Sequence, residues 1–321
     1  MTQDDNPALR HSPANAHSSA EPGDLADELK PLDRQIGWLV VNRWTYRLMR
    51  FLGSLNRPEF DTSDITITDS EEFGTGTVLV TPNTRSGAGA LLLIHGGGYV
   101  IGSPQDILPK AAFFARKLGV PVVCPGYRLS PEAHFPAALD DCHTAWQRLL
   151  NKADQLGVDP SKIVVGGYSA GGGLAATLVQ RLQDEAGTQP AAQLLIYPML
   201  DDRTSKRREI DKPRHRVWSN RNNLFGWDSY LGPSTVRDTT PYCAAARRDE
   251  LAGSPPTWMG VGNCDLFLDE DRAYANRLIN DGVDATYLEV DGAIHGFDMG
   301  VGALAEAFVG SQLSFLKRFT L

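Results

Sequence analysis

Short apolar and β-branched runs alternate with longer amphipathic stretches along the chain from Ile65 onwards. Strands and helices that alternate in this way form a mainly parallel sheet with helices on both faces. The first two runs lie close together and fit an antiparallel hairpin at one edge of the sheet. We expect strands within DITIT, TVLVT, ALLLIHG, VPVVCPGY, KIVVGGYS, QLLIYP, TWMGVGNCD and ATYLEVDG, and helices near residues 106–118, 136–151, 171–186, 269–281 and 303–318.

Three segments depart from this alternation. Residues 1–30 are rich in Ala, Ser, Pro, Asn and Asp without periodicity, which predicts a mobile tail. Residues 33–55 have apolar side chains three and four positions apart, which predicts an amphipathic helix docked on the body rather than on a membrane. Its apolar face would comprise Trp38, Val41, Thr45, Leu48 and Leu52. About sixty residues between IYPML and TWMGVG lack a clear strand, and such an insertion is often a lid.

The insertion is also basic. Between Arg203 and Arg221 there are eight Lys or Arg residues against two acidic ones. The simplest interpretation is a solvated surface. The alternative is a positive potential that attracts anionic substrates to a nearby pocket.

The overall composition fits one large α/β core with a small appendage. Of the 321 residues, 42% are hydrophobic and 22% are charged, and the net charge of -8 argues against a nucleic-acid binder. We find no run of 18 apolar residues and no secretory signal, so we expect a cytoplasmic protein without a membrane span. The cysteines form no C-x-x-C pair, and no His/Cys cluster has zinc spacing, so we expect free thiols and no metal.

The strongest chemical signal is the segment Gly167-Tyr168-Ser169-Ala170-Gly171, between the apolar run IVVG and a helical run. The G-x-S-x-G nucleophile elbow occurs in this strand–turn–helix context. The serine of an elbow is strained, and a Cβ on either flanking glycine would collide with its neighbours. The pattern predicts Ser169 as a nucleophile, with a glycine-rich helix start as the alternative. A phosphate loop is excluded, because no Gly-Lys-Ser/Thr follows.

Three glycines follow His95 at the end of the run ALLLI. Such a loop can turn backbone N–H groups toward a carbonyl oxygen that becomes an oxyanion. In the α/β-hydrolase fold, an HGGG-type loop acts together with the N–H of the residue after the nucleophile, here Ala170. We expect His95 itself to be structural.

A serine nucleophile needs a base, and in this fold the chain order is Ser, then acid, then His. Among seven histidines, only His295 satisfies that order in a loop just past a strand. The acid should end the preceding strand, TWMGVGNCD, which nominates Asp265. Asp269 and Glu270 are alternatives, although a carboxylate at a helix start is favourable for the helix dipole alone.

Six motifs occur in order over residues 60–320. They are HGGGY (95–99), YRLSPEAHFPAALDD (127–141), GYSAGG (167–172), YPMLDDR (197–203), CDLFLDE (264–270) and GAIHGF (292–297). In these motifs the chain resembles the hormone-sensitive-lipase-like carboxylesterases. The resemblance implies an α/β-hydrolase fold with a mostly parallel eight-stranded sheet, helices on both faces and a helical cap. The cap would comprise residues 31–60 and 201–235, and the catalytic core residues 61–200 and 236–321.

The resemblance also implies an activity. It implies a serine carboxylesterase that hydrolyses short- to medium-chain esters through an acyl-enzyme, without a cofactor. The oxyanion hole would consist of Gly97, Gly98 and Ala170. The partner would be a small-molecule ester, and a homodimer is possible. One departure concerns packing or access around the nucleophile, because the family usually has Asp where this chain has Tyr168.

Other functions stay open at this stage. An amidase or a lactonase would use the same residues as an esterase. A non-catalytic small-molecule receptor on the same fold is a further alternative, since fold alone does not fix function. Plant hormone receptors that resemble this family lack the catalytic histidine, whereas His295 is present here. A lipase for long-chain triglycerides would favour a broad apolar lid, in contrast to the charged insertion.

Overall fold

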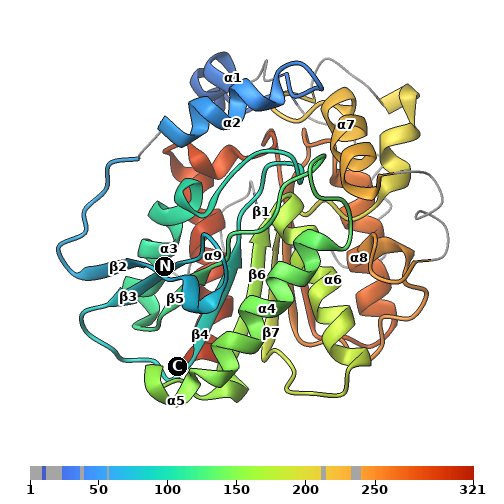
Figure 1. The fold of residues 1–321 in the computed structure, drawn as a ribbon. Helices are drawn as coiled ribbons and strands as arrows, with labels where there is room; N and C mark the ends of the chain where they lie inside the picture. The colour runs from blue at the N-terminus through green and yellow to red at the C-terminus, as the bar shows by residue number, and fades with distance from the viewer. Residues whose placement is uncertain (1–8, 12–23, 37–39, 56–57, 211–214, 233–239) are drawn as a thin grey trace.

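The computed structural model describes residues 9–11, 24–36, 40–55, 58–210, 215–232 and 240–321. Their strands form one nine-stranded sheet in the order β1-β9-β8-β7-β6-β4-β5-β3-β2 (Figure 1). The strands are β1 (Leu9–His11), β2 (Ile65–Asp69), β3 (Val78–Pro82), β4 (Ala90–Ile94), β5 (Val122–Cys124), β6 (Ile163–Tyr168), β7 (Ala192–Ile196), β8 (Thr257–Gly262) and β9 (Ala285–Val290). Strands β2 to β9 are the eight expected runs, and β1 is an addition.

The sheet is parallel through its centre. Strands β5, β4, β6, β7, β8 and β9 run parallel to one another, whereas β2 and β3 form the expected antiparallel hairpin at one edge. Every residue of β4, β6, β7 and β8 is buried, because strands covered on both faces must be apolar throughout. The predicted fold class is confirmed.

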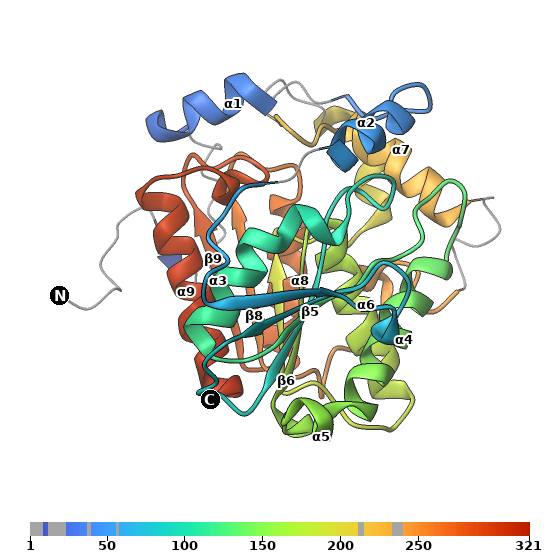
Figure 2. The same cartoon turned by 60° about the vertical axis from the view of Figure 1, so that its left-hand side comes forward.

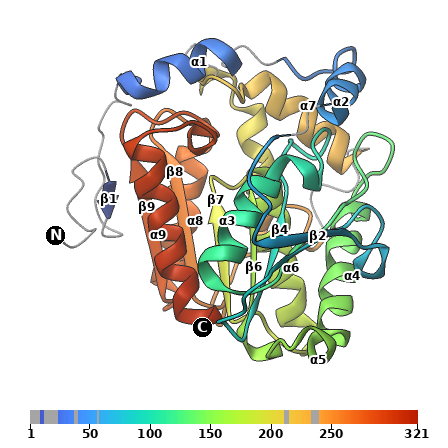
Figure 3. The same cartoon turned by 90° about the vertical axis from the view of Figure 1, so that its left-hand side faces the viewer.

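Two groups of helices cover the sheet. Helices α3 and α9 lie together on one face, and α4, α6 and α8 lie on the other (Figures 1 and 3). The bounds are α3 (Leu108–Leu118), α4 (Ala137–Asn151), α5 (Ala153–Leu156), α6 (Ala170–Asp184), α8 (Leu268–Asn280) and α9 (Ala303–Thr320). Both groups leave the carboxyl ends of the parallel strands uncovered, and that end of an α/β sheet is where ligands bind.

Three further helices lie above those carboxyl ends (Figures 1 and 2). They are α1 (Lys30–Ile36), α2 (Tyr46–Leu55) and α7 (Asn220–Leu231). The N–H of Val41 donates to the side chain of Asn222 at 3.0 Å, and the rings of Tyr46 and Phe225 are 5.9 Å apart. Helix α2 and the residues just before it therefore contact α7. The exact division into a cap of residues 31–60 and 201–235 and a core stays a prediction.

The expectation of a mobile tail over residues 1–30 is wrong for residues 9–11 and 24–30, and the rest of this range lies outside the described residues. Strand β1 pairs antiparallel with β9, and residues 24–30 are ordered. Leu29 is fully buried, and the N–H of Ala26 donates to the carbonyl of Gly292 at 3.0 Å. The buried Leu29 side chain and this backbone hydrogen bond thus hold the segment beside the loop that precedes His295. The polar composition of residues 1–30 as a whole does not indicate these individual contacts.

The expected orientation of the helix over residues 33–55 is also wrong. The segment forms two helices, α1 and α2, rather than one. Val41 is buried as expected, but Leu48 and Leu52 are exposed, and Trp38 lies outside the described residues. Tyr46 is the residue of α2 that is buried against the body. Spacing identifies an apolar face, but it does not determine whether that face points inward.

Within the described part of the chain, no helix is both long and apolar enough to cross a lipid bilayer.

Candidate active site

Ser169 occupies a sharp turn between β6 and α6. Its φ of 54° lies in a region that non-glycine residues rarely adopt. The N–H of Ser169 donates to Ile196 and its carbonyl accepts from Met199, each at 2.9 Å, so strand β7 and the residues after it hold the strained backbone in place.

The two glycines that flank this turn lie so close to neighbouring backbone that no other side chain would fit. A Cβ on Gly167 would lie 2.2 Å from the carbonyl oxygen of Gly171. A Cβ on Gly171 would lie 2.3 Å from the carbonyl oxygens of Ile94 and His95. Helix α6 can therefore begin directly after Ser169, close against β4, only with glycine at both positions.

Ser169, His295 and Asp265 form one hydrogen-bonded chain. His295 Nε2 is 2.9 Å from Ser169 Oγ, and His295 Nδ1 is 2.7 Å from Asp265 Oδ2. With its proton on Nδ1, the imidazole donates to Asp265 and accepts from the serine hydroxyl. The other carboxylate oxygen of Asp265 accepts from the N–H of Phe267 at 3.0 Å. The fold thus brings together three loops that follow three strands of the parallel sheet, β6, β8 and β9.

Two aromatic rings fix the orientation of the imidazole. The rings of Tyr197 and Phe267 both meet His295 edge-on, with centroids 4.8 and 5.3 Å away. The Tyr197 hydroxyl donates to Asp298 at 2.6 Å, and Asp298 forms an ion pair with Lys110 at 3.1 Å. Sequence reasoning missed Tyr197, because nothing in YPMLDDR indicates that its ring would contact a histidine about one hundred positions later.

Asp265, and neither alternative acid, is the carboxylate that contacts His295. Asp269 is exposed and forms an ion pair with Arg207 at 3.6 Å. Glu270 is buried and accepts from the N–H groups of Leu200 and Asp201. Burial raises the pKa of Glu270 to about 8, so it braces the backbone after β7 as a neutral acid at neutral pH.

The HGGG loop lies beside the serine. Gly97 and Gly98 have φ values of 114° and 59°, and a Cβ on Gly97 would lie 2.0 Å from the carbonyl oxygen of Ile101. Ala170 opens α6, so its N–H has no partner within the helix. A Cβ on the adjacent Gly96 would lie 3.3 Å from the Cβ of Ser169, so the loop that contains Gly97 and Gly98 passes beside the nucleophile. In the described part of the chain, no backbone carbonyl accepts from the N–H of Gly97 or Gly98.

His95 is structural, as expected. Its ring is buried and stacks on Tyr127 with centroids 4.1 Å apart. Burial lowers the pKa of His95 to about 4, so the ring is neutral under ordinary conditions. The Tyr127 hydroxyl donates to the carbonyl of His95 at 3.1 Å, which holds the start of the glycine loop.

A second residue missed from the sequence is Trp218, from the insertion. Its buried ring covers Gly98 so closely that a Cβ on that glycine would lie 2.1 Å from it. A third is Arg50 of α2, which donates to the carbonyls of Val100 and Ser130, both at 2.7 Å. The insertion and α2 thus both contact the glycine loop or its immediate continuation.

Tyr168, where the related family usually has Asp, is buried beneath the turn. Its ring is 5.9 Å from that of Tyr197, centroid to centroid. Burial, and secondarily the nearby charge of Asp298, raise the pKa of the Tyr168 hydroxyl well above its usual value. Tyr168 therefore contributes packing behind the nucleophile and stays un-ionised.

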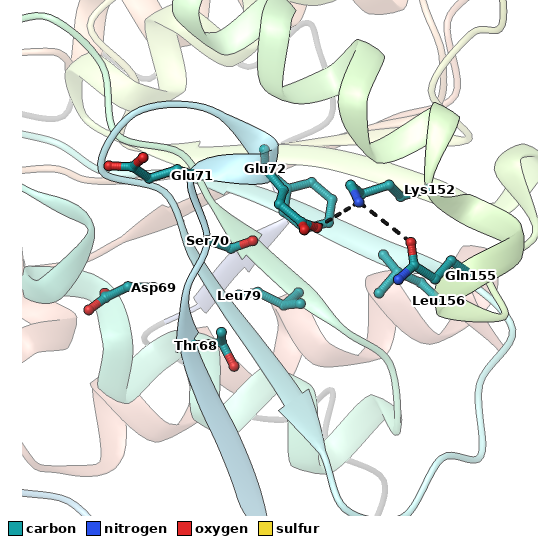
Figure 4. Close-up of a pocket in the computed structure, with 10 residues that line it drawn as sticks. Thr68, Asp69, Ser70, Glu71, Glu72, Leu79, Lys152, Gln155 and Leu156 are labelled. Atoms are coloured by element: carbon teal, nitrogen blue, oxygen red, sulfur yellow. Dashed lines mark hydrogen bonds and ion pairs between the residues drawn. The ribbon is translucent and has the colours of Figure 1, made fainter.

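A surface hollow of about 420 Å³ lies away from this centre, where β2 and β3 meet the end of α4. Glu72 and Lys152 form an ion pair at 2.6 Å in its wall (Figure 4). None of the residues that line it belongs to the hydrogen-bonded chain of Ser169. Across the described residues, no group of three or more His, Cys, Asp or Glu side chains is arranged to hold a metal ion, and all four cysteines are buried free thiols.

The chain matches known proteins over most of its length. The profile of a family described by its alpha/beta hydrolase fold matches residues 91–299. The chain is 32% identical over 218 residues to an ethyl acetate hydrolase of Pseudomonas putida, covering 68% of each protein. It is 34% identical over 235 residues to carboxylesterase NlhH of Mycobacterium tuberculosis, covering 70% of this chain and 72% of that protein.

Solved structures show the same similarity. A bacterial heroin esterase superposes with a TM-score of 0.83 at 32% identity, covering 92% of this chain and 98% of that one. Esterase LipW from Mycobacterium marinum superposes with a TM-score of 0.82 at 27% identity, over the same shares. The family profile, the sequence relatives and the fold agree. The chain therefore belongs to the alpha/beta hydrolase family, in its hormone-sensitive-lipase-like branch.

Proposed function

We propose that this carboxylic-ester hydrolase is a serine carboxylesterase that acts on small esters with short to medium acyl chains. The observation that carries the proposal is the position of the His295 imidazole, within hydrogen-bond distance of both Ser169 and Asp265. Nucleophile, base and orienting acid in this arrangement define the catalytic triad of serine hydrolases. No cofactor or metal takes part in the proposed reaction.

In the proposed acylation step, His295 Nε2 takes the Ser169 proton while Oγ attacks the ester carbonyl carbon. The tetrahedral intermediate collapses, and His295 returns the proton to the leaving alkoxide. Water then attacks the acyl-enzyme with the same assistance and releases the carboxylic acid. Asp265 holds the imidazole with its proton on Nδ1 and stabilises the imidazolium that forms, because the buried carboxylate faces the ring at 2.7 Å.

The oxyanion of each intermediate would accept hydrogen bonds from the backbone N–H groups of Gly97, Gly98 and Ala170. Each donor of this kind contributes about 2.7–4 kcal/mol of transition-state stabilisation. The left-handed backbone of the two glycines supports this role, because it turns successive N–H groups in a way that other residues rarely allow. The start of α6 adds the favourable end of the helix dipole.

The preference for small acyl groups rests on the walls of the site. Ser169 and His295 are only 5% and 6% exposed. The Trp218 ring lies directly against Gly98 and fills the space beside this glycine of the proposed oxyanion hole. A hydrocarbon chain of a long-chain fat would have to displace this buried ring.

Hydrolysis of p-nitrophenyl esters of graded acyl length, next to the corresponding p-nitroanilides and a lactone of similar size, tests the proposal. We expect high kcat/KM for acetyl and butyryl esters, a decline for long chains, and loss of nearly all activity in Ser169→Ala. Faster turnover of the anilide or the lactone would identify an amidase or a lactonase with the same triad. Binding without turnover in the wild type would identify a receptor.

A further inference from the structure

Helix α2 turns an apolar face away from the body of the protein. In and just before this helix, Trp44, Leu48, Phe51, Leu52 and Leu55 are 77, 56, 59, 49 and 63% exposed. Positions three, four and seven apart share one helix face, so these side chains form a continuous strip. Tyr46 and Arg50, on the opposite side, contact the body through Glu132. We call this exposed strip the outer face of α2; among the described residues, none of its side chains packs against the hydrophobic core.

The end of the molecule that carries the outer face is positively charged. The described residues within 31–60 and 201–235 include ten Lys and Arg against six Asp and Glu, whereas the chain outside these two ranges contains eighteen against thirty-two. No acidic residue lies between Asp33 and Glu59. The chain as a whole has a net charge of -8, so the negative charge is concentrated in the remainder of the chain, away from this positive end.

The arginines next to the strip are placed at its border. Arg43 and Arg47 are exposed, and the Arg43 guanidinium lies over the Trp44 ring, 4.6 Å from its centroid. An arginine stem can lie along apolar surface while its charge stays in a polar layer. Trp, Leu and Phe on one face with arginines at the border are typical of helices that lie in the interface of an anionic bilayer.

We propose that the outer face of α2 docks on membranes that contain anionic phospholipids. Docking buries the apolar strip at the level of the acyl chains and places the arginines among the headgroup phosphates. A second copy of the chain fits this face less well, because a symmetric contact would bring two positively charged ends together. The proposal does not depend on the catalytic assignment, and it orients the ends of the parallel strands, where Ser169 lies, toward the bilayer.

Co-sedimentation with lipid vesicles tests the proposal. The wild type should sediment with vesicles of phosphatidylcholine and phosphatidylglycerol in equal parts, bind pure phosphatidylcholine more weakly, and lose affinity as salt is added. The variant Leu48→Gln/Phe51→Gln should bind the mixed vesicles at least about tenfold more weakly, because it removes two exposed apolar side chains that docking would bury. Leu321→Gln, an exposed apolar residue at the C-terminus, is the matched control and should bind like the wild type.

Hydrolysis of a soluble acetyl ester reports whether the double variant is folded, and it should be unchanged. If the double variant is damaged, Arg43→Glu provides a second test and should weaken binding to the mixed vesicles only. Equal binding by the wild type and a folded variant would overturn the proposal. So would a wild type that fails to bind vesicles but forms a dimer that Leu48→Gln/Phe51→Gln abolishes, which would identify a second copy as the occupant.

Discussion

The guanidinium of Arg50 donates from Nε to the carbonyl oxygen of Val100 at 2.7 Å. Val100 directly follows the HGGGY segment, so a residue of α2 holds the end of the glycine loop. The same guanidinium donates to Ser130, whose N–H in turn donates to the carbonyl of Tyr99 at 2.9 Å. Arg50 therefore fixes the loop from two directions.

Replacing Arg50 with Gln should lower kcat by about 10- to 100-fold with a smaller change in KM, because small displacements of oxyanion donors weaken the transition state more than substrate binding. Arg50→Lys should recover part of the loss. Arg47→Gln is the matched control, since the Arg47 side chain bonds only to Tyr46 within the described residues. Equal steady-state kinetics for Arg50→Gln and Arg47→Gln would show that the anchor is irrelevant to turnover.

Asp265→Asn should reduce kcat by up to about 10⁴-fold, because an amide no longer stabilises the imidazolium or its catalytic tautomer. Asp269→Asn should stay close to the wild type, since Asp269 is exposed and paired with Arg207. Steady-state rates of the two variants on one acetyl ester decide between the carboxylates. A larger loss in Asp269→Asn would mean that the wrong acid has been assigned.

Trp218→Leu should shift the acyl-chain preference. Removing the indole opens space above Gly98, so kcat/KM for octanoyl esters should rise relative to acetyl esters by about tenfold, the range expected for a few additional methylene contacts. The change also leaves a partly filled cavity, so a loss of about 1–3 kcal/mol in unfolding free energy is expected alongside. An unchanged ratio between octanoyl and acetyl esters would show that Trp218 does not limit chain length.

The sequence predicted the parts of this site that depend on local chemistry. Ser169 is recognisable because its strained turn demands glycines at fixed positions, and Asp265 and His295 because each follows a strand in the Ser, acid, His order of this fold. Arg50, Tyr197 and Trp218 were not recognisable, because each reaches the site through contacts between distant segments. The orientation of α2 could not be predicted for a related reason, since the apolar face at Leu48 and the buried face at Tyr46 are distinguished only by packing.

The buried Glu270 should make stability decline with rising pH. Burial raises its pKa to about 8 in the folded protein, whereas an unfolded glutamate titrates near ~4.3. Between these values the folded state holds a proton that the unfolded state has released. The contribution of Glu270 to the free energy of unfolding is therefore full below about pH 4 and declines until about pH 8.

Glu270→Gln cannot ionise and still offers a carbonyl oxygen to the N–H groups of Leu200 and Asp201. The Tm of this variant minus that of the wild type should therefore increase from about pH 5 to about pH 8. Thermal unfolding followed by circular dichroism measures this difference, with the exposed Asp269→Asn as control. A constant difference across this range would contradict the assignment of a neutral Glu270.

The central claim is that Ser169 is the nucleophile and that His295 activates it. Its most direct test is mass spectrometry of the protein after reaction with a p-nitrophenyl phosphonate, whose phosphorus atom forms a stable bond to the attacking oxygen as p-nitrophenolate leaves. We predict one phosphonyl group per chain, located on the peptide that contains Ser169, and labelling that is strongly slowed in His295→Ala. Labelling of a different residue, or persistent ester hydrolysis by a protein whose Ser169 is fully modified, would contradict it.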